Sequence, residues 1–311
     1  MRPPRYLPML ATPWPGPFDD DAWAFEAKWD GIRALVTWDG AVTITGRRGD
    51  DLTGRYPELT GLGGSRPFVV DGEIVSLGRD GRPSFEMLQQ RIGIADPGAS
   101  RRAAGETPVT LVAFDLLFDG TPLIDLPYRE RRRRLEALRL PVPISEATVA
   151  EGTALFEAVR GRGLEGLVAK RLDSPYRPGV RSPDWRKIAN LRTVRAVVGG
   201  FTAGEGGRRG TFGALVLGLW HEGTLRWIGS VGTGFRDRDL AAIRAALDEM
   251  ATPHCPFSPH RDLPAATWVE PSLVASVGFR EWTSAGRVRQ PRFRGFTDDP
   301  VESVTWEAEG P

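Results

Sequence analysis

Lysine is rare in this chain, and the few lysines present are candidates for chemistry. Only three of the 41 Lys plus Arg residues are lysine, namely Lys28, Lys170 and Lys187. So strong a preference for arginine is typical of a biased coding genome. A guanidinium stays protonated, whereas an amine can lose its proton and act as a nucleophile. The three lysines are therefore candidate chemical groups, the alternative being that they were retained by accident.

Lys28 lies in the segment EAKWDGIR, which spans residues 26–33. The segment places a lysine, a carboxylate, a glycine and an arginine at a predicted junction between a strand and a turn. Once deprotonated beside other cations or a metal, the Lys28 amine can attack the α-phosphate of a nucleotide. By itself Lys-x-Asp-Gly is a weak signal, and a surface lysine before a turn fits it equally well.

Further segments with chemical side chains follow in order along the chain. They are Gly46-Arg47-Arg48-Gly49, Val70-Asp71-Gly72-Glu73, Phe114-Asp115-Leu116-Leu117, Glu165-Gly166-Leu167-Val168-Ala169-Lys170, and the stretch that holds Arg181, Trp185 and Lys187. All three lysines fall within this ordered set or within the segment around Lys28, which argues against accidental retention.

The ordered set resembles the motifs of the covalent nucleotidyltransferases. The residues within and around each motif are most similar to those of the ATP-dependent ligase domain of bacterial end-joining DNA ligases. The resemblance covers nearly the whole chain. It implies a DNA ligase that uses ATP and Mg²⁺ or Mn²⁺ and carries AMP covalently on Lys28. The AMP would pass to a 5′-phosphate in nicked or broken double-stranded DNA, and the 3′-hydroxyl would then displace it.

The same resemblance assigns roles by matching position. Lys28 would be the catalytic nucleophile, and oxygen ligands suit Mg²⁺. Glu26 would face the adenine, Phe114 would stack on it, and Glu73 would hold the ribose. Arg33 and Arg47 would lie near the sugar and phosphates, and the α-phosphate would be surrounded by Lys170, Arg181 and Lys187. Asp30 and Glu165 would bind the metal. The simpler alternatives are core packing for Phe114 and strand-end charges for Glu73, Arg33 and Arg47.

Hydrophobic patterning predicts an α+β protein of two domains. Strands are predicted at 34–38, 42–45, 68–75, 109–118 and 166–170, and helices at 85–92, 129–138 and 153–160. In the helix at 129–138, the run Arg131–Arg134 is typical of a solvated face. This first domain, residues 1–192, would be an adenylyltransferase domain of antiparallel sheets with helices. Residues 193–311 would form a closed oligonucleotide-binding (OB-fold) β-barrel. Its predicted strands are at 194–201, 214–220, 225–231 and 268–282, and its predicted helix is at 239–250.

Any DNA surface must come from local charge, because the formal net charge is only +1. The candidate DNA-binding residues are all arginines. Arg208 and Arg209 lie in the glycine-rich loop 204–210, and the others are Arg48, Arg289, Arg292 and Arg294. Arginine contacts to phosphates would make binding weaken with salt. The alternative for Arg208 and Arg209 is that they are merely solvated. The resemblance also suggests a Ku-like end-binding protein and separate polymerase and nuclease chains as partners.

Two regions depart from the family pattern. Ala189 stands where a second lysine usually follows Lys187, and the last motif, which opens at Arg289, has Thr297, Asp299 and Pro300 where arginine and aspartate-lysine are expected. In the family this element orients the pyrophosphate during self-adenylylation. We therefore expect slow charging by ATP but retained sealing of DNA that already carries a 5′ AMP, unless Arg292 or Arg294 substitutes.

Composition excludes several other classes. The single cysteine, Cys255, excludes a disulfide framework and a zinc site of three or four thiolates. An NAD-dependent ligase would carry a four-cysteine zinc element and a module before the lysine motif. No apolar run approaches the roughly 20 residues of a membrane span, so a cytoplasmic, nucleoid-associated monomer without membrane contact is predicted. The remaining rivals are an RNA capping guanylyltransferase and a DNA-end binding protein that has lost turnover.

Overall fold

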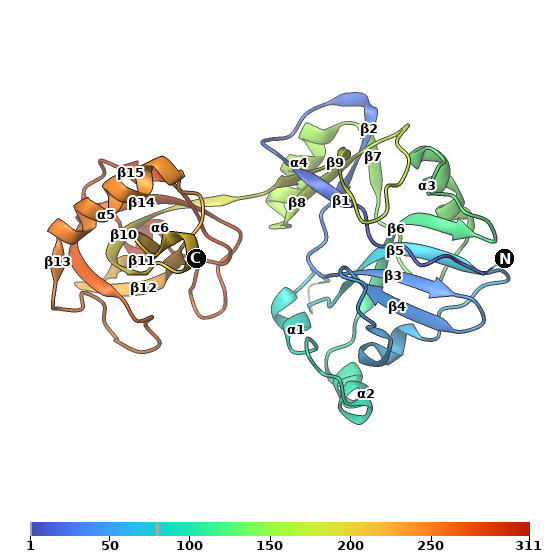
Figure 1. Ribbon diagram of the computed structural model, residues 1–311, viewed down its shortest axis with the longest axis horizontal. Helices are drawn as coiled ribbons and strands as arrows, with labels where there is room; N and C mark the ends of the chain where they lie inside the picture. Colours follow the sequence, from blue (N-terminus) through green and yellow to red (C-terminus); the bar gives the residue numbers. More distant parts are fainter. Residues whose placement is uncertain (1, 79–80) are drawn as a thin grey trace. The chain divides into compact units, whose positions relative to one another are not determined.

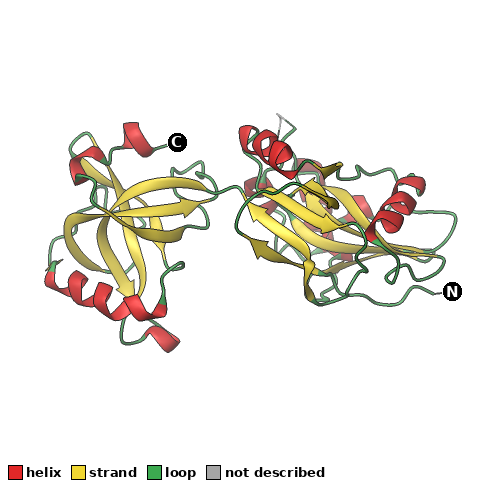
Figure 2. Cartoon of the chain, turned by 90° about the horizontal axis from the view of Figure 1, so that it is seen from above, coloured by secondary structure: helices red, strands yellow, loops and turns green. Residues whose placement is uncertain are grey.

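The computed structural model describes residues 2–78 and 81–311, and the chain divides into two compact units (Figure 1). The first unit ends at Asn190 and the second begins at Leu191, two residues before the predicted boundary. Strands are the main regular structure of both units, and helices lie beside the sheets (Figure 2). None of the helices in the described residues combines the length and apolar character needed to span a bilayer.

One antiparallel sheet of the first unit has the strand order β4-β3-β5-β6. Its strands are β3 (Ile32–Trp38), β4 (Val42–Gly46), β5 (Phe68–Val75) and β6 (Thr110–Asp119). The predicted strands in this region are confirmed to within two residues, because they consist of β-branched and aromatic runs separated by turns. A core that includes Val36, Ile44, Val70 and Leu111 lies against this sheet.

A second sheet of this unit has the order β1-β9-β8-β2-β7. Its strands are β1 (Leu10–Trp14), β2 (Asp20–Ala27), β7 (Ala147–Ala150), β8 (Gly166–Arg171) and β9 (Arg181–Ala189). The β1–β9 pair is parallel, an exception within the predicted antiparallel sheets. The other neighbours in this sheet are antiparallel. Strand β9 was not predicted, since its charged residues and Pro183 hide the strand pattern.

The helices of the first unit are η1 (Thr53–Arg55), η2 (Pro57–Leu59), α1 (Phe85–Gln89), α2 (Pro97–Glu106), α3 (Tyr128–Ala137) and α4 (Gly152–Gly161). The three helices predicted in this unit are present as α1, α3 and α4, whereas α2 and the two short 3-10 helices were not predicted. Ser84 and Asp96 cap α1 and α2 by accepting backbone N–H groups. The interpretation of Arg131 as part of a solvated face is wrong: its side chain is fully buried and pairs with Asp115 of β6 at 2.8 Å.

The second unit is a curled antiparallel sheet with the order β12-β11-β10-β14-β13, and β15 also pairs with β14. The strands are β10 (Arg192–Ala203), β11 (Phe212–His221), β12 (Thr224–Val231), β13 (Ala251–Thr252), β14 (Thr267–Phe279) and β15 (Arg292–Thr297). The helices are η3 (Gly206–Arg208), η4 (Asp237–Asp239), α5 (Leu240–Glu249), η5 (Val301–Ser303) and α6 (Trp306–Glu309).

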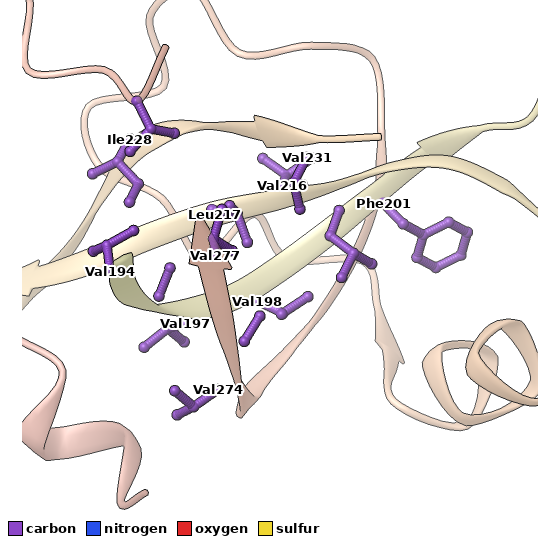
Figure 3. Close-up of a cluster of buried hydrophobic side chains, with 14 of the residues drawn as sticks. Val194, Val197, Val198, Phe201, Val216, Leu217, Ile228, Val231, Val274 and Val277 are labelled. Atoms are coloured by element: carbon purple, nitrogen blue, oxygen red, sulfur yellow. The ribbon is translucent and has the colours of Figure 1, made fainter. Parts of the chain in front are cut away.

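The predicted closed barrel is wrong in one respect. Among the residues that the structure describes, no strand ladder joins the edge strand β12 to β15 or β13. Two backbone bonds partly bridge the gap, because Val288 N donates to Ile228 O and Phe293 N donates to Thr233 O, both at 2.8 Å. The sheet curls around a valine-rich core, shown in Figure 3. The α+β class is confirmed, with a barrel that stays open.

Candidate active site

A cavity of about 170 Å³ opens in the first unit between strands of its two sheets. One water needs roughly 10–15 Å³ of such space, so the cavity suits a ligand much larger than a water or an ion. Its lining residues are Leu10, Ala11, Glu26, Ala27, Lys28, Trp29, Arg33, Arg47, Glu73, Phe114, Val168, Lys170, Arg181, Trp185 and Lys187. All nine residues that the sequence predicted as the nucleophile or nucleotide ligands are among them.

The two-residue repeat of a strand explains why these side chains share one cavity. Side chains two positions apart point to the same face of a strand. Strand β8 lies between β2 and β9 in the sheet, so one face of three neighbouring strands borders the cavity. The pairs on that face are Glu26 with Lys28 at the end of β2, Val168 with Lys170 on β8, and Trp185 with Lys187 on β9.

Two glycines allow the backbone around Lys28 to pack closely. A Cβ at Gly31 would lie 2.2 Å from the carbonyl oxygen of Ile74, and one at Gly166 would lie 2.0 Å from that of Ile188. Gly166 also has a positive φ of 137°, which favours glycine. Its carbonyl oxygen accepts a hydrogen bond from the Lys28 backbone N–H at 2.8 Å. The glycines of both motifs are therefore required by close approach of the chain.

Lys28 lies at the end of the cavity that is rich in cations. Its ammonium forms an ion pair with Glu165, which immediately precedes β8. The Lys28 side chain is 26% exposed and that of Glu165 is 13% exposed, so this pair keeps contact with solvent. Lys28 can therefore meet an incoming phosphate without being extracted from the core.

Lys187 belongs to the same group of charges. Burial lowers the pKa of Lys187, and the positive charges of Lys28, Arg181 and Arg47 lower it further. Four positive side chains thus act on one another across a small space, which is unfavourable until an anion arrives. We call Lys28, Glu165, Lys187, Arg181 and Arg47 the cationic end.

Glu73 lies opposite Arg33 in the β3–β5 ladder. Burial raises the pKa of Glu73 to about 7, although Arg33 and Lys28 counteract the shift. Arg33 is not directed to a phosphate in this structure, because its guanidinium donates to both carboxylate oxygens of Asp71 at 2.5 and 2.7 Å. Tyr176 donates to the same carboxylate at 2.6 Å. The predicted role of Arg33 at the phosphates stays a prediction, and its observed partner is Asp71.

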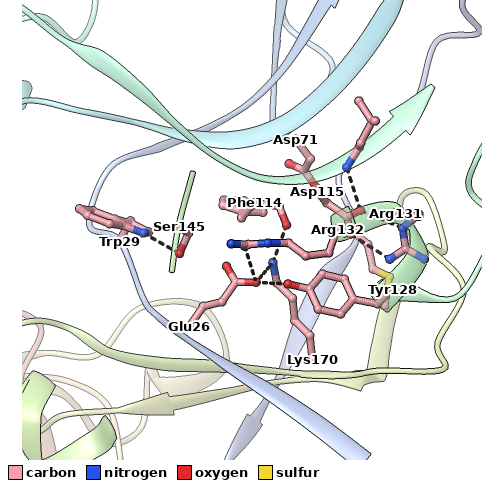
Figure 4. A network of polar contacts seen from close by, with 12 residues as sticks. Glu26, Trp29, Asp71, Phe114, Asp115, Tyr128, Arg131, Arg132, Ser145 and Lys170 are labelled. Atoms are coloured by element: carbon pink, nitrogen blue, oxygen red, sulfur yellow. Dashed lines mark hydrogen bonds and ion pairs between the residues drawn. The ribbon is translucent and has the colours of Figure 1, made fainter. Parts of the chain in front are cut away.

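The other end of the cavity is buried and centred on Glu26 (Figure 4). Lys170 Nζ lies 2.7 Å from a Glu26 carboxylate oxygen, and Tyr128 donates its hydroxyl proton to the same oxygen. Lys170 also donates to the Phe114 carbonyl at 3.0 Å. Burial raises the pKa of Tyr128 well above its usual value, so the hydroxyl stays a donor. We call Glu26, Lys170, Tyr128 and the nearby Arg132 the acceptor end.

Lys170 therefore has different neighbours from those that the sequence suggested. Its side chain is 1% exposed, and burial lowers its pKa while Glu26 opposes that shift. The charged groups that act on it are Glu26, Asp115 and Arg132, whereas Lys187 responds to Lys28, Arg181 and Arg47. A place at the α-phosphate stays a prediction for Lys170, which the structure ties to the acceptor end.

Aromatic side chains form the wall between the two ends. Phe114 is 7% exposed, packs edge-on against Trp185 with ring centroids 6.2 Å apart, and has the Lys170 ammonium 4.4 Å from its ring centroid. It therefore belongs to the core as well as to the cavity lining, so base stacking stays a prediction. Trp29 is fixed by a hydrogen bond from its indole nitrogen to Ser145 at 3.0 Å.

The predicted metal ligands are not gathered into a complete cage. In the described part of the chain, no group of three or more His, Cys, Asp or Glu side chains could hold an ion. Mg²⁺ is often held by only one or two carboxylates together with substrate phosphates. Glu165 beside Lys28 fits such a site, whereas Asp30 is not among the lining residues.

Sequence reasoning missed Tyr128 and gave no role to Trp185. Tyr128 is 102 residues from its partner Glu26, and nothing in its own neighbourhood marks it out. Trp185 was noticed only as part of a motif, yet it is buried beside Phe114 and Tyr176.

The predicted DNA-binding arginines differ in their surroundings. Arg48, Arg209, Arg292 and Arg294 are exposed. On β15 the exposed positions alternate, which presents Arg292, Arg294 and Phe296 on one face. Arg208 instead donates to the Gly232 carbonyl at 2.7 Å, and Arg289 pairs with Glu281, so these two have internal partners.

The altered last motif lacks the expected cations and holds an internal ion pair. Asp299 lies 2.7 Å from the guanidinium of Arg195 on β10, and Arg195 also pairs with Glu309 of α6. Thr297 ends β15, and Pro300 precedes η5. The segment is thereby fastened to its own unit.

Comparison with known families gives two matches along the chain. Residues 8–189 match the ATP dependent DNA ligase domain, and residues 208–300 match the ATP dependent DNA ligase C terminal region. The multifunctional non-homologous end joining DNA repair protein LigD of Mycobacterium tuberculosis is 40% identical over 291 residues, which cover 90% of this chain and 37% of that protein. A DNA ligase of Thermococcus onnurineus is 32% identical over 91% of this chain and 53% of its own length.

Solved structures show the same relationship. A mycobacterial DNA ligase D complexed with ATP is 37% identical, covers 96% of this chain and 98% of its own, and has a TM-score of 0.56. The ligase domain of M. tuberculosis LigD has a TM-score of 0.55 at the same identity. The chain spans no more than about two fifths of the length of the LigD proteins that it matches. With a family match over more than half of its residues, this chain belongs to the ATP-dependent DNA ligase family.

Proposed function

We propose that this chain seals breaks in double-stranded DNA through an AMP group carried on Lys28. In the first step the Lys28 amine loses its proton and attacks the α-phosphorus of ATP. A P–N bond forms, the bond between the α-phosphorus and the bridging oxygen breaks, and pyrophosphate leaves. The AMP then passes to the 5′-phosphate at a nick, and the 3′-hydroxyl displaces it to form the phosphodiester.

The observation that carries this proposal is the cationic end of the cavity. Lys28, Lys187, Arg181 and Arg47 surround a space that can hold a nucleotide, and their mutual repulsion favours an anionic ligand. Charge that develops on the phosphates would be stabilised by groups already in place. Mg²⁺ or Mn²⁺ held by Glu165 and the phosphates, with Asp30 as a further carboxylate, would neutralise more of that charge.

The rest of the cavity fits the nucleoside. Glu26 offers a carboxylate oxygen at the acceptor end, where an adenine amino group can donate. Phe114 and Trp29 supply flat surfaces, and Glu73, protonated or charged near neutral pH, lies where it can bond a ribose hydroxyl. DNA would be held by exposed arginines that include Arg48, Arg209, Arg292 and Arg294, so binding should weaken as salt rises.

A direct test separates charging from joining. The protein is incubated with α-labelled ATP and Mg²⁺, and then with nicked DNA or with nicked DNA that already carries a 5′ AMP. Lys28→Arg is the matched variant, because it keeps the positive charge beside Glu165 but removes the nucleophile. We expect label on the wild type and none on Lys28→Arg. Label that persists on the variant would refute the assignment of Lys28.

A second candidate function has its own observation. Thr297 and Pro300 replace the expected cations, and Asp299 is engaged by Arg195. A protein that binds nicks or DNA ends without turnover would have these features. A nicked duplex that is joined by the wild type, but not by Lys28→Arg, would exclude this reading.

The biological setting follows from similarity alone. The LigD relatives are named as non-homologous end joining proteins, and we propose that this chain acts in end joining, as a monomer associated with the nucleoid. A Ku-like end-binding protein and separate polymerase and nuclease chains are the partners that this proposal implies. Co-purification of the tagged chain with such a protein from its own cells would test the assignment.

A further inference from the structure

The two carboxylate oxygens of Glu26 have different surroundings. Lys170 Nζ lies 2.7 Å from Oε1, Tyr128 donates its hydroxyl proton to that oxygen, and Arg132 Nη1 lies 3.9 Å from it. Figure 4 shows these dashed lines converging on the one oxygen. In the described part of the chain no hydrogen bond is made to Oε2, and this oxygen keeps access to solvent, although the residue is only 2% exposed and lines the cavity.

An oxygen that faces a cavity without a hydrogen bond inside the protein needs a donor from any ligand that displaces its water. Buried polar atoms are almost always hydrogen-bonded, because a missing partner costs the desolvation of the group. Lys170 and Tyr128 both contact Oε1, so that oxygen is occupied and Oε2 is the one that faces the cavity as an acceptor. Glu26 therefore presents an acceptor and no donor to the cavity.

Such an acceptor discriminates between purines. Adenine carries an amino donor at position 6, whereas guanine and hypoxanthine carry a carbonyl oxygen there. A carboxylate oxygen can accept from the amino group but repels the carbonyl, and the mismatch leaves two buried acceptors without a donor. The selectivity depends on Glu26 staying charged and staying in place.

We propose that Tyr128, acting through Glu26, is a positioning residue that makes the cavity select 6-amino purines over 6-oxo purines. The inference rests on the proposed use of this cavity for a nucleotide. Tyr128 comes from α3, outside the strands that line the cavity, and its side chain is 1% exposed. It would act by fixing Oε1 with its hydroxyl, which leaves Oε2 directed to the base.

The test compares AMP with IMP, which carries a carbonyl oxygen in place of the 6-amino group. Affinities are measured by titration calorimetry on the full chain for wild type, Tyr128→Phe, Glu26→Gln and the double variant. Tyr128→Phe keeps the ring and removes only the hydroxyl. We expect the AMP-to-IMP affinity ratio to fall about tenfold, the size of one hydrogen bond to a charged group. Glu26→Gln should lower the ratio further, because an amide can also donate.

Two features make the measurement specific. Both nucleotides are titrated into the same preparation, so an inactive fraction cancels from the ratio. Tyr56→Phe is the matched control, because Tyr56 is equally buried but belongs to a core cluster away from the lining residues. We expect the control to keep the wild-type ratio. In the double variant the loss of the Tyr128 hydroxyl should have no further effect on the ratio.

Several results would overturn the inference. They are equal losses of AMP and IMP affinity in Tyr128→Phe, an additive effect in the double variant, and a wild type that binds both nucleotides equally or neither. Failure of the proposed function is distinguishable, because these titrations need no covalent chemistry. Selective AMP binding without any lysyl-AMP would refute the function and leave the role of Tyr128 standing.

Discussion

The two ends of the cavity use the same kind of side chain in opposite ways. Lys28 at the cationic end is 26% exposed and lies among other cations, whereas Lys170 at the acceptor end is 1% exposed and is held by Glu26 and the Phe114 carbonyl. A lysine near solvent and near like charges is suited to react. A lysine with every neighbour fixed is suited to hold another group in place.

The comparison separates binding selectivity from chemistry. The cationic end is incomplete without an anion, because its four positive side chains outnumber the nearby carboxylates Glu165 and Glu73. The acceptor end is held together without a ligand, because Lys170 and Tyr128 both contact Glu26, although Arg132 Nη1 there is buried without a hydrogen-bond partner. Changes at the first end should therefore alter rates, and changes at the second should alter stability and base preference.

The largest effect is expected from Lys187→Ala at the cationic end. Removing one prepositioned positive charge should slow formation of the Lys28-AMP bond on the order of 10²- to 10³-fold. AMP affinity should change far less. Single-turnover labelling with α-labelled ATP measures the rate, and the exposed Arg162→Ala serves as a control. A decrease in the labelling rate smaller than about tenfold would contradict the assignment of the chemical step to the cationic end.

Stability should respond in the opposite order. Lys170→Met leaves the buried Glu26 without its cation and should cost about 3–5 kcal/mol of unfolding free energy. Lys187→Met removes a charge that is repelled by its neighbours and should cost less than about 1 kcal/mol. Urea denaturation of the two variants decides the matter, and equal costs would remove the distinction between the ends.

Glu73 lines the same cavity, acts on Lys28 and Glu165, and should make stability depend on pH. Its pKa is raised from the usual value near 4.5 to about 7, so the folded protein binds more protons than the unfolded chain between those values. Stability should fall as pH rises through this window, by about 1–2 kcal/mol after allowance for contact with solvent. Glu73→Gln should be flatter and more stable at pH 8. Urea denaturation midpoints of the wild type and of Glu73→Gln are measured from pH 5 to pH 8. If the two midpoints change with pH in the same way, Glu73 is not the cause of the pH dependence.

The smallest effect concerns the missing cations of the last motif. Restoring them with Thr297→Arg and Pro300→Lys should speed charging by ATP about tenfold, a gain of roughly 1.4 kcal/mol. Sealing of DNA that already carries a 5′ AMP should not change. Equal acceleration of both steps, or equal slowness of both in the wild type, would show that the altered motif does not act on the first step.

Local patterns predicted much of the fold. The strands around Val36, Val70 and Leu111 and the helix at 240–249 are visible because apolar periodicity is strong there. Strand β9 escaped because its pairing with β8 outweighs a poor local pattern. The parallel β1–β9 pair and the open edge of the second sheet also depend on long-range pairing, which no local window records.

The sequence by itself determined which side chains could do chemistry, since three lysines in ordered motifs, the segment around Gly31 and the single cysteine are all read from the chain. Only the tertiary structure decided how they are grouped, placing Lys28 with Glu165 and Lys170 with Glu26 and Tyr128. The reason is physical: residue type fixes what a group can do, but burial and the neighbours brought by distant strands fix its charge, its partners and its freedom to react.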